Sequence, residues 1–176
     1  MDDISRKLKS IDWSRLQRQA KKVQASTASA LKDLVMTDLE NKVRAATADT
    51  AWGASSSDLM EIAQGTFHRE DCALIMSIVW QRLGSSRWRC VYKALEVLRY
   101  LLMHGSARCL EAACSAQHHI QSLEHYRCID PDTHKDEGEN VRARAAMVVS
   151  MIANPAILDE EREKDKVLRA KLSSGT

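Results

Sequence analysis

The stretch WRCVYKALEVLRYLLMHGSAR, residues 88–108, holds the helical pattern around which the rest of the chain can be organised. Its apolar side chains recur three and four residues apart, and further apolar residues widen this stripe until little of the helix can face water. The stripe consists of Val91, Leu95, Leu98, Leu101 and Leu102, widened by Ala94, Val97 and Tyr100. Gly105 is expected to end the helix, because glycine is common just past a helix end. A helix that is apolar on nearly all sides belongs in the middle of an all-helical domain.

Three basic residues, Arg87, Arg89 and Lys93, stand at the start of this central helix. Positive charge at a helix N-terminus opposes the helix dipole, so helix stability does not account for these residues. An anionic ligand would account for them. The pattern therefore predicts an anion-binding surface at this helix end.

The remainder of the chain repeats the helical spacing in shorter stretches, and no segment alternates with the period of a strand. Thr37 and Glu40 match a capping box, and Ser57 is expected to cap the following helix. The expected helices lie near residues 37–48, 57–63, 72–83, 88–104, 106–117, 120–126, 141–152 and 159–172. Short loops between such helices predict an all-α, right-handed superhelix (solenoid) of about eight helices.

Length, charge and cysteine count limit the possible classes. A chain of 176 residues is large enough for one domain with a real core and an appendage. The formal net charge is +2, so any basic surface must arise from clustering. The odd number of cysteines, five, predicts reduced thiols of a cytosolic protein. We also expect no membrane span and no secretory signal, so any membrane contact would be made from the cytosol.

Residues 1–36 form a basic amphipathic segment before the main domain, which we expect to cover residues 37–172, followed by a short tail at 173–176. Apolar residues keep a roughly helical spacing between many lysines and arginines, and Trp13 lies at the edge of the stripe. Such a helix is typical of a membrane surface. Alternatively, the segment docks on the domain or frays, since the Ser/Thr/Ala-rich stretch 25–30 weakens helix continuity.

Three motifs occur in a fixed order: KVRAATADTAWGASSSDLMEIAQGTF (42–67), IVWQRL (78–83) followed by the central helix, and HKDEGENVRARA (134–145). Together they resemble the epsin N-terminal homology (ENTH) domain family. The resemblance covers residues 37 to about 172. It implies an ENTH/VHS-like superhelix that binds phosphoinositides without catalysis and without a cofactor.

The resemblance also implies which residues would contact a lipid headgroup. They are Arg44, Arg82 and Arg87, and we add Lys93 from the basic cluster at the start of the central helix. Guanidinium groups match phosphate oxygens bidentately, and several such contacts add. Asp49 and Cys90 depart from the family pattern, because the first would repel phosphate and the second brings no positive charge. The reduced positive charge predicts weak or altered selectivity among headgroups, for example toward a monophosphate. Alternatively, these arginines form structural ion pairs or face water and bind no lipid.

In this family, a segment before the first helix folds over the headgroup and inserts into the bilayer. Here Lys21, Lys22 and Lys32 would assist electrostatically, while Leu31, Leu34 and Val35 would enter the membrane. Ser26 and Ala30 stand where basic residues are expected.

The resemblance further implies a peripheral membrane adaptor in clathrin-mediated trafficking, on the plasma membrane, endosomes or Golgi-derived vesicles. Clathrin and adaptor complexes would bind through a tail that is not in this chain, and a SNARE is a possible cargo. The alternative is a helical interaction module that binds a SNARE or sorting cargo without lipid recognition.

Other classes have less support. Six soft ligands could form a zinc site, but no Cys-x-x-Cys pair is present, so we predict no metal. They are Cys109, Cys114, His118, His119, His125 and Cys128. Ser56, His68 and Asp71 lack the motifs of a catalytic triad, so we predict no enzyme. No interleaved aromatic residues support nucleic-acid binding by the basic segment.

Overall fold

The structure, a computed structural model, describes residues 37–130 and 134–174. These residues form eight α-helices and a short 3-10 turn, with no β-strand among them and one isolated antiparallel bridge between Ile129 and Asp136. In chain order the elements are α3 (Asp38–Ala46), α4 (Ser56–Gly65), α5 (Arg69–Leu83), α6 (Trp88–His104), α7 (Ala107–Ser115), α8 (Gln117–Ser122), η1 (Leu123–His125), α9 (Gly138–Ala153) and α10 (Pro155–Ser174). The all-α prediction is confirmed.

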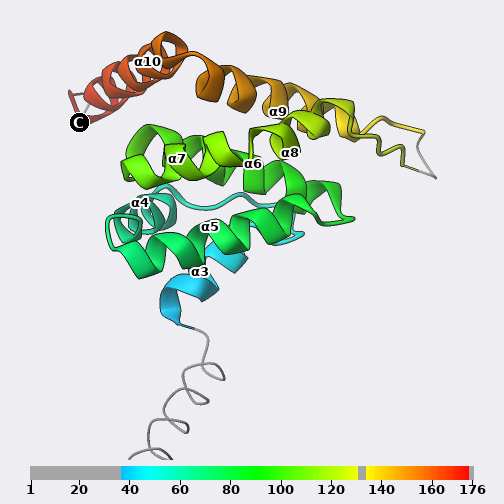
Figure 1. The fold of residues 1–176 in the computed structure, drawn as a ribbon, viewed down its shortest axis with the longest axis horizontal. Helices are drawn as coiled ribbons and strands as arrows, with labels where there is room; N and C mark the ends of the chain where they lie inside the picture. Colours follow the sequence, from blue (N-terminus) through cyan, green and yellow to red (C-terminus); the bar gives the residue numbers. More distant parts are fainter. Residues whose placement is uncertain (1–36, 131–133, 175–176) are drawn as a thin grey trace, which may run out of the picture. The chain divides into compact units, whose positions relative to one another are not determined.

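Helix α6 is the central helix, as its broad apolar stripe predicts. It contacts α3, α4, α5, α7, α9 and α10. Ten of its 17 residues are buried, so nearly every face of it is covered by another helix. Figure 1 shows α9 and α10 along one side of this unit and α3 on the opposite side, with α6 between them.

Gly105 ends α6, but not through the left-handed conformation that glycine often supplies at a helix end. Its φ and ψ are −83° and −178°, an extended backbone open to any residue. The requirement is space, because a Cβ at this position would lie 2.6 Å from the Leu101 carbonyl oxygen. It would also lie 3.1 Å from both Cys109 Sγ and Thr66 Oγ1. The carbonyl of the last turn of α6, together with the side chains of Cys109 and Thr66, therefore leaves room only for glycine here.

The N-cap of α4 is Ser55, so the prediction of Ser57 was wrong by two residues. Ser55 Oγ accepts a hydrogen bond from the Asp58 amide at 3.1 Å and donates one to Asp58 Oδ2 at 2.6 Å. Within the run Ser55-Ser56-Ser57, only Ser55 has an acidic side chain three positions later, which gives it the pattern of a capping box.

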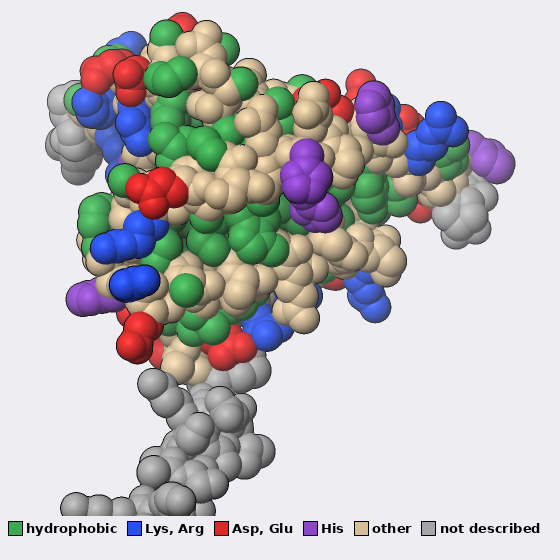
Figure 2. Space-filling view, viewed as in Figure 1, with side chains coloured by type: hydrophobic (Ala, Val, Ile, Leu, Met, Phe, Trp, Pro, Cys, Tyr) green, Lys and Arg blue, Asp and Glu red, His purple; other side chains and the backbone are tan. Residues whose placement is uncertain are grey.

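Helix α10 begins at Pro155, four residues before the predicted start, and is the solvated helix of mixed charge that was expected. Proline suits the first turn of a helix, and Asn154 Oδ1 accepts from the Ala156 amide at 3.0 Å. Leu158 is buried, whereas Val167 and Leu168 are exposed. Figure 2 shows acidic and basic side chains next to one another at the α10 end of this face.

Within residues 37–130 and 134–174, no single helix is long and apolar enough to cross a membrane. By length and composition alone, α9 and α10 would match a span together, but they are bent by 112° where they meet.

Candidate functional site

The Lys93 ammonium group lies beneath the turn that connects α3 to α4. It donates to the carbonyl oxygens of Ala48 at 2.8 Å, Thr50 at 2.7 Å and Trp52 at 2.5 Å, and to Thr50 Oγ1 at 2.9 Å. Burial lowers the pKa of Lys93. An ammonium group has three donors, and all of them are engaged by this turn. In this conformation Lys93 holds the turn and has no donor left for a headgroup.

Arg87 lies at the N-terminal end of α6 and pairs with Asp49 in the same turn. Its Nη1 donates to Asp49 Oδ2 at 2.7 Å, and this hydrogen bond raises the pKa of Arg87. The Arg87 side chain is 68% exposed, against 25% for Asp49. Asp49 was expected to repel a bound anion. In the structure it neutralises Arg87, one of the arginines that were expected to bind that anion.

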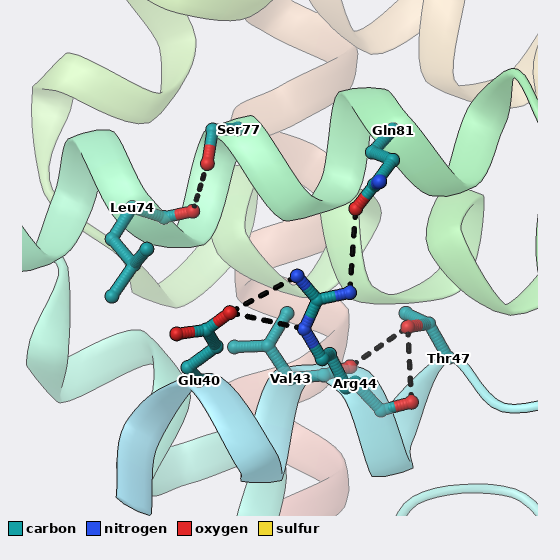
Figure 3. Close-up of polar contacts among 7 residues, drawn as sticks. All are labelled: Glu40, Val43, Arg44, Thr47, Leu74, Ser77 and Gln81. Carbon is teal, nitrogen blue, oxygen red and sulfur yellow. Dashed lines mark hydrogen bonds and ion pairs between the residues drawn. The ribbon is translucent and has the colours of Figure 1, made fainter. Parts of the chain in front are cut away.

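Arg44, on the last turn of α3, is held by two helices (Figure 3). Its Nε and Nη2 donate to Glu40 Oε1 at 3.1 and 3.0 Å, and its Nη1 donates to Gln81 Oε1 on α5 at 3.3 Å. Thr47 directly follows α3, and its hydroxyl donates to the Val43 carbonyl at 2.8 Å, which satisfies an acceptor at the C-terminal end of the helix. The guanidinium is thus fixed in position, and its charge is offset by one carboxylate.

Arg82 is next to Gln81 in the last turn of α5, and it is half-buried. It forms no ion pair with any residue in the described part of the chain, and its Nε is buried without a hydrogen-bond partner there. A buried polar atom without a partner calls for an explanation such as a missing ligand. Arg82 is therefore the best candidate among the predicted residues for a contact that the domain itself does not supply.

Three of the predicted arginines come from neighbouring parts of the fold: α3, the last turn of α5 and the residue before α6. Arg44 contacts Gln81, the neighbour of Arg82, and Arg87 contacts the turn that follows α3. We call Arg44, Arg82 and Arg87 the arginine surface. It is formed by α3, the end of α5 and the loop before α6. Cys90 is buried in α6 and offers this surface no charge.

The remaining predicted residues are not placed by the structure, apart from the candidate metal ligands. Lys21, Lys22, Lys32, Leu31, Leu34 and Val35 lie outside the described residues, so their roles stay predictions. All five cysteines are free thiols. Among the described residues, no three His, Cys, Asp or Glu side chains are grouped so that they could hold a metal ion.

Sequence reasoning also missed a feature beside this surface, the stacking of Arg89 on Trp88. The Arg89 Cζ lies 4.7 Å from the centroid of the Trp88 ring. The adjacent letters W-R give no sign of it, because neighbouring residues on a helix do not normally face each other.

Comparison with known proteins identifies the fold. The family model described as ENTH domain matches residues 36–158. The chain is 38% identical over 136 residues to Clathrin interactor EPSIN 1 of Arabidopsis thaliana, covering 76% of this chain and 24% of that protein. It is 37% identical over 132 residues to Clathrin interactor 1 of Homo sapiens, covering 73% of this chain and 21% of that protein. It thus spans only a small part of these relatives' length.

Solved structures agree with this assignment. The crystal structure of the human epsinR ENTH domain has a TM-score of 0.68 at 37% identity, covering 74% of this chain and 97% of that one. The ENTH domain from epsin-2, solved in complex with phosphatidylinositol 4,5-bisphosphate, has a TM-score of 0.68 at 31% identity, covering 73% and 91%. The superhelical fold expected from the three motifs is confirmed, and the chain belongs to the ENTH domain family.

Proposed function

We propose that this domain recognises an anionic phosphoinositide headgroup and acts as a non-catalytic membrane adaptor in clathrin-related vesicle trafficking. The observation that carries the proposal is the arginine surface, on which Arg82 has a buried Nε without a partner among the described residues. Support comes from the family, in which the epsin-2 domain was solved with a phosphoinositide and relatives are named clathrin interactors.

Arg82 makes the first contact with the phosphate in this proposal. It has no ion pair within the described residues that would have to break first. Arg44 and Arg87 contribute by exchanging Glu40 and Asp49 for phosphate oxygens. Guanidinium groups suit such exchange, since their planar fork binds carboxylate and phosphate in the same way. Lys93, predicted as a ligand, instead acts indirectly by fixing the turn that carries Asp49.

Asp49 influences which headgroup binds. Three carbonyls of its turn are tied to Lys93, so the Asp49 carboxylate stays near the site after Arg87 has exchanged it for phosphate, and it would repel an additional phosphate. This favours a headgroup with one phosphate over one with two.

The N-terminal segment completes the proposal. Lys21, Lys22 and Lys32 add attraction to the anionic surface, and Leu31, Leu34 and Val35 enter the bilayer. The protein would be peripheral on the plasma membrane, endosomes or Golgi-derived clathrin-coated vesicles. Its partners would be clathrin, adaptor complexes and a SNARE cargo.

Co-sedimentation of the whole chain with liposomes that each carry one phosphoinositide tests this function. Arg82→Glu is expected to weaken selective binding about tenfold or more, because it replaces attraction to phosphate with repulsion. Arg44→Glu should abolish binding without unfolding the domain. Arg69→Glu is the matched control: Arg69 is exposed at the opposite end of α5 and should leave binding nearly unchanged. Equal binding by Arg82→Glu and Arg69→Glu would contradict the assignment.

A second candidate function is a protein-interaction module with no lipid recognition. It is favoured by the carboxylates that already neutralise Arg44 and Arg87. Failure of the unaltered whole chain to bind any phosphoinositide liposome would select this candidate, and the search would move to SNAREs and coat proteins.

A further inference from the structure

A pocket of about 450 Å³ is lined in part by the turn that carries Asp49. None of the residues of the arginine surface lines it. Its walls come from the α3–α4 turn, α4, α6 and the first turn of α9. This volume is in the range of sites that take a small ligand or one or two side chains of a partner.

The floor of the pocket is apolar. Ala46, Leu59 and Val97 line it, together with the stem of Lys93, whose ammonium group is directed into the turn. Trp88 and Tyr92 supply aromatic walls. A recess of this kind fits a bulky apolar side chain, because it removes apolar surface from water on both partners.

The aromatic wall is held in place by contacts between α6 and α9. The Arg144 Cζ on α9 lies 5.8 Å from the centroid of the Tyr92 ring, and its Nη2 lies 2.5 Å from Glu96 Oε1. Arg99 Nε lies 3.5 Å from the other oxygen of the same carboxylate. The negative charge of Glu96 is therefore offset by two arginines.

Arg89 on the rim is positioned to receive an acidic group. It is exposed and stacks on Trp88, and it makes no ion pair or hydrogen bond within the described residues. Stacking restricts the guanidinium while leaving its N–H edge open, which suits a carboxylate. Its place in the first turn of α6 adds to this, because a helix N-terminus attracts negative charge.

The rim also offers free main chain. Ala51, Gly53 and Ala54 line the pocket, and their amides make no hydrogen bond to other backbone in the described part of the chain. Exposed backbone donors beside a pocket can pair with the main chain of an extended ligand. The beginning of α9 adds the amide side chain of Asn140, which can both donate and accept.

We propose that this pocket is a docking site for an extended peptide segment of a partner protein. A bulky apolar residue of the peptide fills the recess, and an acidic residue within two positions of it pairs with Arg89. The spacing follows from the short distance between the Trp88 wall and Arg89, since an extended chain advances about 3.3 Å per residue. This site shares none of the three arginines proposed to bind the headgroup.

Selection of a random twelve-residue peptide library, displayed on phage, against the whole chain tests the proposal. The expected consensus contains a bulky apolar residue with Asp or Glu within two positions. Failure to enrich any sequence, or a consensus without an acidic residue, would overturn the proposal.

A synthetic peptide of the selected sequence then locates the site by fluorescence anisotropy. Arg89→Glu is expected to weaken binding about tenfold or more, whereas Arg69→Glu, the same exchange in the first turn of α5, should not. Replacing the acidic residue of the peptide by its amide should weaken binding to the unaltered chain by a similar factor. This second measurement keeps the test valid if Arg89→Glu does not fold. A lysine at that peptide position should recover binding to Arg89→Glu.

Two further results would count against the site. Equal affinity of the peptide for the unaltered chain and for Arg89→Glu would exclude the pairing. Displacement of the peptide by a soluble inositol bisphosphate would place it on the arginine surface. Persistence of peptide binding in Arg44→Glu is expected and would separate this site from the proposed function.

Discussion

The Lys93 ammonium group satisfies three main-chain carbonyls and one hydroxyl of the α3–α4 turn. Lys93→Met keeps the apolar stem but leaves these acceptors without their donor. A buried acceptor without a partner costs about 1–3 kcal/mol, so we expect the free energy of unfolding to fall by about 2 kcal/mol. Urea unfolding measures this change.

Lys166→Met is the control for Lys93→Met. Lys166 is exposed on α10 and pairs only with the exposed Glu163 within the described residues. Its replacement should change stability by no more than about 0.5 kcal/mol. Equal effects of the two substitutions would show that the turn does not depend on Lys93.

Gly105 and Gly53 form a second matched pair at the residue scale. Gly105→Ala would bring a Cβ within 2.6 Å of the Leu101 carbonyl, so the end of α6 must shift, and we expect a loss of about 1–3 kcal/mol. A Cβ at Gly53 meets nothing within 4 Å. Gly53→Ala should therefore be neutral or stabilise by up to about 1 kcal/mol, because it restricts the unfolded chain. Thermal unfolding of both variants checks this contrast.

At the scale of elements, the docking of α10 on α6 depends on a charged cluster. His104 Nε2 lies 3.2 Å from Asp165 Oδ2, and Arg169 Nε lies 2.7 Å from the same oxygen. Arg169 also donates to Tyr100 Oη at 2.9 Å. Burial of His104, followed by repulsion from Arg169, lowers the pKa of this histidine despite the attraction of Asp165.

This cluster predicts how stability depends on pH. Because the pKa of His104 is below its ordinary value of 6.5 in the folded chain, the unfolded chain takes up the proton first as pH falls. The contribution of His104 to the free energy of unfolding is present above pH 6.5 and declines as pH falls below that value. We expect His104→Gln to flatten the difference in urea stability between pH 7.5 and 5.5. His119→Gln, at an exposed position, should retain that difference.

The sequence predicts the existence of helices that have a one-sided or all-round apolar pattern. It predicts the residues at which these helices begin and end less well. Helix α6 follows from its stripe because burial on all faces leaves no other arrangement. The cap of α4 was misplaced among three consecutive serines, although Asp58 three positions after Ser55 was the signal that could have selected it. The start of α10 was missed because the motif Asn154-Pro155 ends one helix and also begins the next.

The candidate site was less predictable, because charge in a sequence does not reveal its partner. Arg44, Arg82 and Arg87 belong to α3, the last turn of α5 and the residue before α6, and their joint role toward a headgroup stays a prediction. Nothing in the sequence shows that Asp49 pairs with Arg87 across 38 residues, or that Lys93 points into a turn more than 40 residues away. Such pairs depend on how α3, α5 and α6 pack, which only the folded chain determines.

At the scale of the whole molecule, the ENTH unit should fold without the N-terminal segment. Residues 38–176 form one compact unit with its own core, so a chain that begins at Thr37 is expected to unfold within a few degrees of the whole chain. Its liposome binding should be weaker, because Lys21, Lys22 and Lys32 are removed, but its preference among phosphoinositides should persist. Circular dichroism and co-sedimentation measure the two properties.

Two other outcomes of the truncation would change the assignment of lipid recognition. Loss of all binding with an intact fold would assign recognition to the N-terminal segment. Unchanged binding would assign it to the arginine surface alone and would remove the proposed roles of Leu31, Leu34 and Val35.

Arg44 is paired with Glu40 and Arg87 with Asp49, so an anion can bind either arginine only by displacing a carboxylate of the domain. An incoming anion must replace a carboxylate that is tethered at high local concentration. Chloride, with a single diffuse charge, competes poorly on those terms, whereas a phosphate ester presents several oxygens at once. If the proposed function holds, the domain should therefore ignore the abundant small anions of a cell and still respond to the dense phosphate array of a membrane.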